Sequence, residues 1–379
     1  MRRFWWLSIL LMILVVFAFV AIHGVMHNAE LVRTSGLSGG LNVYESSHFY
    51  KDDTTAKFTA LPCPLDIISA INPLGGAGSA NPHSIPSNHV TVQTKGKGDG
   101  HVFPVYAVAD GYIVQVNYQP ASEPALDGTP KQLDGFALTL QVSKDLFIMQ
   151  NHLNSLAPDL AAKIGSLQPG NQNFPNVFVN SGSLLGQGGG SPALASTDLW
   201  AIDLTRPAPF IHPDWYGAQD AYSVNALDYF VEPLKSELYD KLPARPEPRA
   251  GQFAYDIDGK LVGNWISLQH SQEGATLSFF YYSFDPSLVY IGYAPIQMVY
   301  VVKGNVPDPA TISVASGLVK FELMNSSSYF GQDNPGSFHV EATMLVQMLA
   351  DRHIKMEIFE GKTANEVNGF DANALEFIR

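Results

Sequence analysis

The sequence predicts a mainly β protein, and three observations lead to this expectation. Hydrophobic residues make up 46% of the 379 positions and charged residues only 15%, which is typical of a globular chain with large cores. Glycine (32) and proline (25) are both frequent, which favours many turns and few helices. Short stretches alternate apolar and polar residues with a period of two, the pattern of a half-buried strand.

The first segment is a candidate membrane anchor. Residues Phe4 to Ile22 are apolar except for Ser8, and they follow Arg2-Arg3. About 19 residues at about 1.5 Å rise each nearly span a bilayer core of about 30 Å. Because the basic end is expected to stay in the cytoplasm, residues 1–27 predict a membrane-anchored, extracytoplasmic protein that contacts the membrane through residues 4–22. If the segment is instead a cleaved signal peptide, the protein is secreted.

The rest of the chain divides into three parts. Residues 28–87 are polar and then rich in proline, glycine and serine, so we expect a stalk and a loop-rich lead-in. Residues 88–242 predict a β domain with a closing helix. The segment Pro243 to Arg249 contains three prolines and marks a boundary. Residues 250–379 then predict a C-terminal antiparallel β-sandwich or barrel.

Within residues 88–242, a hairpin is the first clear prediction. Residues 103–109 and 112–118 read as two strands joined at Asp110-Gly111, because glycine accepts the positive φ of a tight turn. Residues 119–134 read as a long turn-rich insertion. Further elements expected in order are strands at 88–93, 136–142, 146–152 and 198–204, a short helix at 153–164, and an amphipathic helix at 226–242 that Pro233 should kink or split.

The C-terminal part carries several alternating strands and few chemical groups. Strands are expected at 277–284, 296–303, 317–324 and 338–349, with turn signals such as Asp258-Gly259 between them. Gly263-Asn-Trp265 resembles the Gly-x-Trp of lipocalin-type barrels. One hypothesis is therefore that this domain carries a ligand and that the preceding domain is only a spacer.

Charge and cysteine content exclude several classes of function. The formal net charge is −13, and no basic cluster follows Arg2-Arg3, so a nucleic-acid partner is not expected. Cys63 is the only cysteine, so no intrachain disulfide can form, and we expect a buried thiol. The sequence contains no nucleophile elbow, phosphate-binding glycine loop or dinucleotide fingerprint.

Five segments between residues 88 and 204 resemble, in order, the lysostaphin-type zinc endopeptidases, which cut peptide cross-links in bacterial cell walls. They are Asn88-His89, at the start of the family's His-x-x-x-Asp; the Val105–Val116 hairpin; Asn151-His152-Leu153, for Tyr-x-His-Leu; the glycine-rich turn Ser181–Gly189; and Leu199–Leu204, for His-Leu-His-Phe-Glu. The resemblance implies a β-sandwich built from a duplicated hybrid motif.

The same resemblance implies a degenerate zinc site. His89 matches the first ligand of the family, but Gln93 stands where the family has aspartate and Trp200 where it has the last histidine. Indole cannot bind zinc, and a neutral amide is a poor ligand, so no cofactor is expected. The auxiliary histidine is retained as His152. Trp200 either fills the space of the metal or offers a substrate-binding platform for a sugar.

The leading hypothesis is a catalytically inactive, peptidase-like protein that binds a cell-wall polymer or an envelope protein. The first alternative is an active zinc metallohydrolase with a rearranged site, in which His89 and Asp203 are metal ligands and His152 is the catalytic base. Asp198 is a further carboxylate that the neighbouring strands could bring to this site. The second alternative is the ligand carrier described above.

Overall fold

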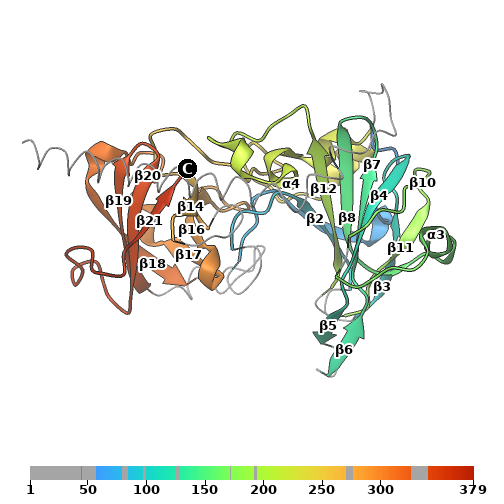
Figure 1. Cartoon of the computed structure of the whole chain (residues 1–379), viewed down its shortest axis with the longest axis horizontal. Helices are drawn as coiled ribbons and strands as arrows, with labels where there is room; N and C mark the ends of the chain where they lie inside the picture. Colours follow the sequence, from blue (N-terminus) through green and yellow to red (C-terminus); the bar gives the residue numbers. More distant parts are fainter. Residues whose placement is uncertain are drawn as a thin grey trace, which may run out of the picture.

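The computed structural model describes residues 44, 57–78, 84–96, 100–124, 129–170, 172–191, 194–269, 276–325 and 340–379. The expected membrane segment lies outside this part of the chain. Among the described residues, no helix has the length and apolar character needed to cross a bilayer. The protein is mainly β, with two antiparallel sheet systems and few helices, and Figure 1 shows the two systems side by side along the long axis.

The first system, the sheet unit, contains an eleven-stranded sheet with the central order β1-β2-β12-β8-β7-β4-β10. β11 pairs with both β8 and β3, so it connects β3 to the central strands. The strands are β1 (Ile68–Asn72), β2 (Val90–Thr94), β3 (Val102–Tyr106), β4 (Gly111–Tyr118), β7 (Phe136–Gln141), β8 (Leu146–Leu156), β9 (Gln172–Asn173), β10 (Val177–Val179), β11 (Leu184–Gly189), β12 (Ser196–Asp203) and β13 (Ser223–Val224).

The expected lead-in at 28–87 is wrong for its last part. β1 pairs along its length with β2, and Phe58, Cys63 and Ile71 are fully buried in the core of the sheet unit. Proline and glycine are frequent in this segment, but its apolar side chains still supply one edge of the sheet. The boundary expected at Pro243–Arg249 also lies further along the chain, because Phe253 packs into the core of the sheet unit.

The expected hairpin at Asp110-Gly111 is also wrong, although both strands exist. β3 pairs with β11, whereas β4 pairs with β7 and β10, so the two strands lie in different parts of the sheet. Gly111 does not adopt a positive φ. A Cβ there would lie 2.7 Å from the carbonyl oxygen of Gln141, so the glycine allows β7 to approach closely.

The helices are short, and α3 and α5 each begin at a proline or directly after one. β8 continues to Leu156, so the helix expected from 153 begins later, as α3 (Pro158–Ile164). The 226–242 segment is split at Pro233, as expected, into the 3-10 helix η3 (Ala226–Tyr229) and α5 (Leu234–Tyr239). The insertion at 119–134 forms a hairpin of its own, β5 (Ala121–Pro124) and β6 (Pro130–Leu133), which projects from the sheet unit in Figure 1.

The second system, the barrel unit, is a closed eight-stranded barrel, which decides between the sandwich and the barrel. Each strand pairs with the next, and the last pairs with the first. Phe279, Phe321 and Met344 are among the fully buried side chains of its core. The strands are β14 (Gly263–Ser267), β15 (Leu277–Tyr281), β16 (Val289–Tyr293), β17 (Met298–Val302), β18 (Leu318–Asn325), β19 (Val340–Ala350), β20 (His353–Glu360) and β21 (Leu375–Ile378).

Polar contacts join the two units. The carboxylate of Asp256 accepts hydrogen bonds from the backbone N–H of Ile211 (3.0 Å) and from that of Asn264 (2.8 Å). Arg352 donates to both carboxylate oxygens of Asp258, at 3.0 Å each, and its Nη1 lies 3.2 Å from Nε2 of His212. Ile211 and His212 belong to the sheet unit. Their contacts with Asp256 and Arg352 therefore attach the barrel unit to the sheet unit.

Candidate functional site

The candidate site lies where three adjacent strands, β2, β12 and β8, meet. His89 directly precedes β2, His152 lies on β8, and Asp198 and Trp200 lie on β12. The register pairs Thr91 with Asp198, and its continuation places Trp200 opposite His89. Positions 198 and 200 point to the same side of β12 because side chains alternate along a strand.

Asp198 is the centre of the site. One carboxylate oxygen, Oδ2, lies 3.3 Å from Nε2 of His152 and 3.7 Å from Nε2 of His89. The other oxygen, Oδ1, accepts a hydrogen bond from the hydroxyl of Thr91 at 2.8 Å. Asp198 is 3% exposed and His89 is 2% exposed, whereas the side chain of His152 is 32% exposed. Of the two imidazoles, His152 is therefore the one that solvent reaches.

His89 is enclosed by polar and aromatic neighbours. Its Nδ1 lies 3.2 Å from Oδ1 of Asn88, whose amide nitrogen donates to Asp220 at 2.6 Å. The ring of Trp200 lies against His89, with 4.5 Å between the ring centroids and 54° between the planes. The indole ring of Trp200 therefore packs directly against the imidazole of His89.

His152 has an unusual backbone conformation. Its φ is +64°, in the left-handed region that non-glycine residues seldom adopt. Its backbone N–H donates to Oδ1 of Asn151 at 2.7 Å, and Nδ1 of its ring lies 3.5 Å from the hydroxyl of Ser196. The pairing of β7 with β8 shifts register at this point, between Gln150 and Leu153. Such irregularities redirect side chains and cluster at functional sites.

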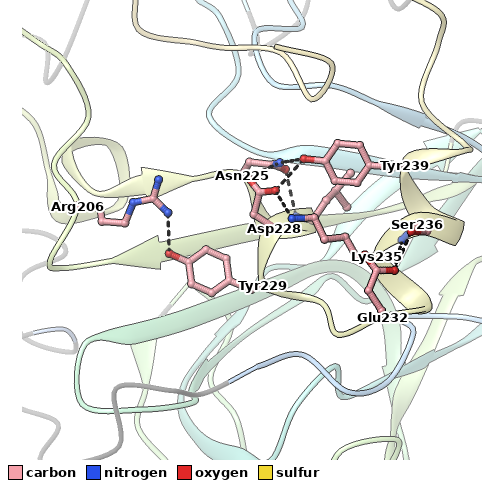
Figure 2. Close-up of polar contacts among 9 residues, drawn as sticks. Arg206, Asn225, Asp228, Tyr229, Glu232, Lys235, Ser236 and Tyr239 are labelled. Carbon is pink, nitrogen blue, oxygen red and sulfur yellow. Dashed lines mark hydrogen bonds and ion pairs between the residues drawn. The ribbon is translucent and has the colours of Figure 1, made fainter. Parts of the chain in front are cut away.

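Asp203 does not join the two histidines. It ends β12, five residues beyond Asp198, a distance of about 17 Å along a strand. Burial disfavours the ionised form, but hydrogen bonds from Thr205 and from Tyr229 (2.5 Å) outweigh it and lower the pKa of Asp203. Figure 2 shows the surrounding polar cluster, in which Arg206 donates to the hydroxyl of Tyr229 at 3.4 Å.

The described side chains around His89 do not form a zinc site. Across the ranges that the structure describes, no group of three or more histidine, cysteine, aspartate or glutamate side chains has the arrangement to hold a metal ion. Gln93 pairs with Ser196 in the strand register, and Trp200 lies against His89. The residues at the family's three ligand positions therefore do not fit the metal.

A groove of about 620 Å³ runs past His152 and Trp200. Its walls come from β7, β8 and β12 and from the base of the β5–β6 hairpin, so the insertion contributes to the site. Sequence reasoning missed the amides of this wall, because isolated asparagine and glutamine residues carry no motif. The lining residues are Asn117, Gln119, Pro120, Leu133, Asp134, Gly135, Phe136, Ala137, Met149, Asn151, His152, Leu153, Asn154, Leu194, Trp200 and Gln219.

Comparisons with known proteins give little similarity. No family model matches the sequence, and no curated protein matches it significantly. Among solved structures, a chain of the SpoIIQ-SpoIIIAH pore forming complex matches with 12% sequence identity and a TM-score of 0.25, over 48% of this chain and 96% of that chain. A TM-score of 0.25 does not establish a shared fold. The structure itself shows an eleven-stranded antiparallel sheet followed by a closed eight-stranded barrel.

Proposed function

We propose that this protein is a membrane-anchored, extracytoplasmic binding protein whose sheet unit is a degenerate lysostaphin-type peptidase domain. It binds an extended peptide of the cell envelope, such as a wall cross-link, and does not cut it by zinc chemistry. The observation that carries this proposal is the groove beside His152, whose wall includes Trp200 at the position of the family's last zinc ligand.

The chemistry of the groove supports a peptide ligand. Phe136, Met149 and Trp200 provide apolar and aromatic surface, and the amides of Asn117 and Asn151 can pair with peptide groups. Among the residues that the structure describes, the indole N–H of Trp200 is buried without a hydrogen-bond partner. Because that nitrogen has almost no exposed surface, a ligand in the groove would contact the ring of Trp200 rather than its N–H.

Net charge narrows the ligand class further. At −13 the chain repels polyanionic wall polymers over the distance that salt leaves unscreened. The groove itself combines apolar and neutral polar side chains, with Asp134 as its one charged residue among those described. A neutral or mixed-charge peptide therefore suits it better than an anionic polymer.

The test is calorimetric titration of the full-length protein in detergent with soluble cross-linked wall peptides. We expect saturable binding that Trp200→Ala weakens about 30-fold, which corresponds to about 2 kcal/mol for the loss of a buried tryptophan contact. Phe178→Ala is the matched control, because Phe178 is 42% exposed on β10 and does not line the groove. Equal binding by wild type and Trp200→Ala, or no binding at all, would contradict the proposal.

A metal assay separates the alternative enzyme from the binding protein. Elemental analysis of the zinc-dialysed protein should give far less than one zinc per chain. One zinc per chain that is lost in His89→Ala, together with chelator-sensitive release of wall peptides, would instead favour the metallohydrolase.

A further inference from the structure

We propose that Ser196, His152 and Asp198 form a nucleophile, base and orienting acid for metal-independent acyl transfer. The inference rests on the proposed groove as the binding site, and it goes beyond that function by adding a reaction. The substrate class is an ester or amide held in the groove. Ser196 is buried and is not among the groove's lining residues, so the carbonyl carbon must enter past the partly exposed ring of His152 to reach it. Ser196 and Asp198 are two residues apart on β12, so they share a face, and His152 projects from the adjacent strand β8.

The hydrogen-bonding pattern assigns the roles. A buried carboxylate accepts hydrogen bonds, so Asp198, at 3.3 Å, keeps the proton of the neutral imidazole on Nε2 of His152. Nδ1 then carries the lone pair, and it lies 3.5 Å from the hydroxyl oxygen of Ser196. The two ring nitrogens have exchanged places relative to serine proteases, but such sets are defined by geometry and role. The serine contact is long, as is common before substrate binds.

The environment fixes these side chains. Thr91 donates to Oδ1 of Asp198, and Nε2 of His89 lies 3.7 Å from Oδ2, the same oxygen that His152 contacts. The left-handed φ of His152 is maintained by the hydrogen bond from its N–H to Asn151. Strain of this kind persists only where surrounding structure requires it. His89 and Thr91 are thus positioning residues for Asp198.

The reaction proceeds in two balanced steps. In the first, the oxygen of Ser196 bonds to the acyl carbon while its proton passes to Nδ1 of His152, and the leaving alcohol or amine departs with that proton. In the second, water attacks the acyl-serine, gives its proton to the same nitrogen, and releases the carboxylic acid and Ser196. The amide of Asn151, which lines the groove beside His152, is the side chain that we assign as donor to the developing oxyanion.

The first test is labelling with a fluorophosphonate probe, which forms a phosphonyl–serine bond and releases fluoride. We expect one label per chain, mapped to Ser196 by peptide mass spectrometry. Ser196→Ala should abolish labelling, and Asp198→Asn should slow it by a factor on the order of 10³–10⁴. Ser155→Ala, on β8 where it pairs with Gln187 of β11, should label at the wild-type rate. Labelling that survives in Ser196→Ala would overturn the proposal.

The second test does not depend on the serine variant being inert. In Ser196→Cys, the new thiol should react with iodoacetamide at least 10-fold faster than in the same variant carrying His152→Ala. The background is low because Cys63 is fully buried and burial raises its pKa to about 12. Equal rates in the two variants would overturn the proposal. If the wild type binds wall peptide but takes no probe, acyl transfer fails while the proposed binding function stands.

Discussion

Replacement of Trp265 by alanine should destabilise the barrel unit more than a typical core substitution. Trp265 has no exposed surface, and its indole N–H donates to the carbonyl of Leu261 at 2.8 Å. The guanidinium carbon of Arg379 lies 4.1 Å from the ring centroid. Arg379 is itself buried, and burial lowers its pKa to about 10. The side chain therefore fills the core, satisfies a carbonyl and covers a cation at once.

The magnitude follows from these three roles. Truncation of a buried tryptophan costs about 3–5 kcal/mol. A desolvated cation–π contact adds about 2 kcal/mol, and an orphaned carbonyl about 1–3 kcal/mol. Because the contributions overlap, we expect a total of about 5–7 kcal/mol, comparable with the whole stability of many domains. Trp265→Phe keeps an aromatic side chain but loses the indole hydrogen bond, and should lower the free energy of unfolding by about 2 kcal/mol.

Hydrogen exchange read by mass spectrometry is the assay, because it reports the two units separately. Amides of β14 to β21 should lose protection in Trp265→Ala, while those of β8 and β12 keep it. Leu318→Ala on β18 is the control, since Leu318 is 40% exposed and should cost less than about 0.5 kcal/mol. A cost below about 1 kcal/mol for Trp265→Ala would refute the reasoning.

Three further predictions concern the sheet unit. The double variant Gln93→Asp/Trp200→His restores the ligand types of the zinc family and should bind one zinc per chain by elemental analysis; a double variant that binds no more zinc than wild type would count against the resemblance. Hydrogen bonds outweigh burial and lower the pKa of both Asp203 and Asp228, so their stabilisation is present above about pH 4 and is lost as pH falls through the lowered folded-state values. Urea unfolding between pH 5 and 2 should therefore show a shallower loss of stability in Asp203→Asn/Asp228→Asn, and an unchanged slope would refute this assignment. Cys63 should not react with a disulfide reagent at pH 8 until denaturant is added, because burial raises its pKa to about 12; prompt reaction of the native protein would show that the thiol is accessible.

The alternation of apolar and polar residues predicted where strands lie better than it predicted which strands pair with each other. Alternation located the mainly β fold and the barrel, because it reflects burial on one face of a sheet. Asp110-Gly111 failed as a hairpin signal because Gly111 allows a close approach to Gln141 without adopting a positive φ. A turn motif specifies local conformation, whereas pairing depends on contacts between segments distant in sequence.

One part of the candidate site could be predicted from the sequence: which side chains of β12 point to the same face of the sheet. Asp198 and Trp200 have the same parity on β12 and point to one side, whereas Asp203 has the opposite parity and ends the strand. The choice of Asp203 as a ligand rested on its residue type and on the expectation that these strands are neighbours, and strand parity would have favoured Asp198. The bend that gives His152 its positive φ has no sequence signal. It lies at the register shift of β8 against β7, between Gln150 and Leu153.

Closure of the barrel has a consequence for the order in which the chain folds. β14 has a hydrogen-bonded partner in β21, through pairs such as Ile266 with Ile378, so the first strand depends on the last. Contacts between residues so distant in sequence carry a large loop-closure entropy and slow folding. During synthesis the sheet unit can acquire its core while the barrel strands wait for β21 to emerge. Until then β14 keeps one exposed edge, the period in which a chaperone would be most useful.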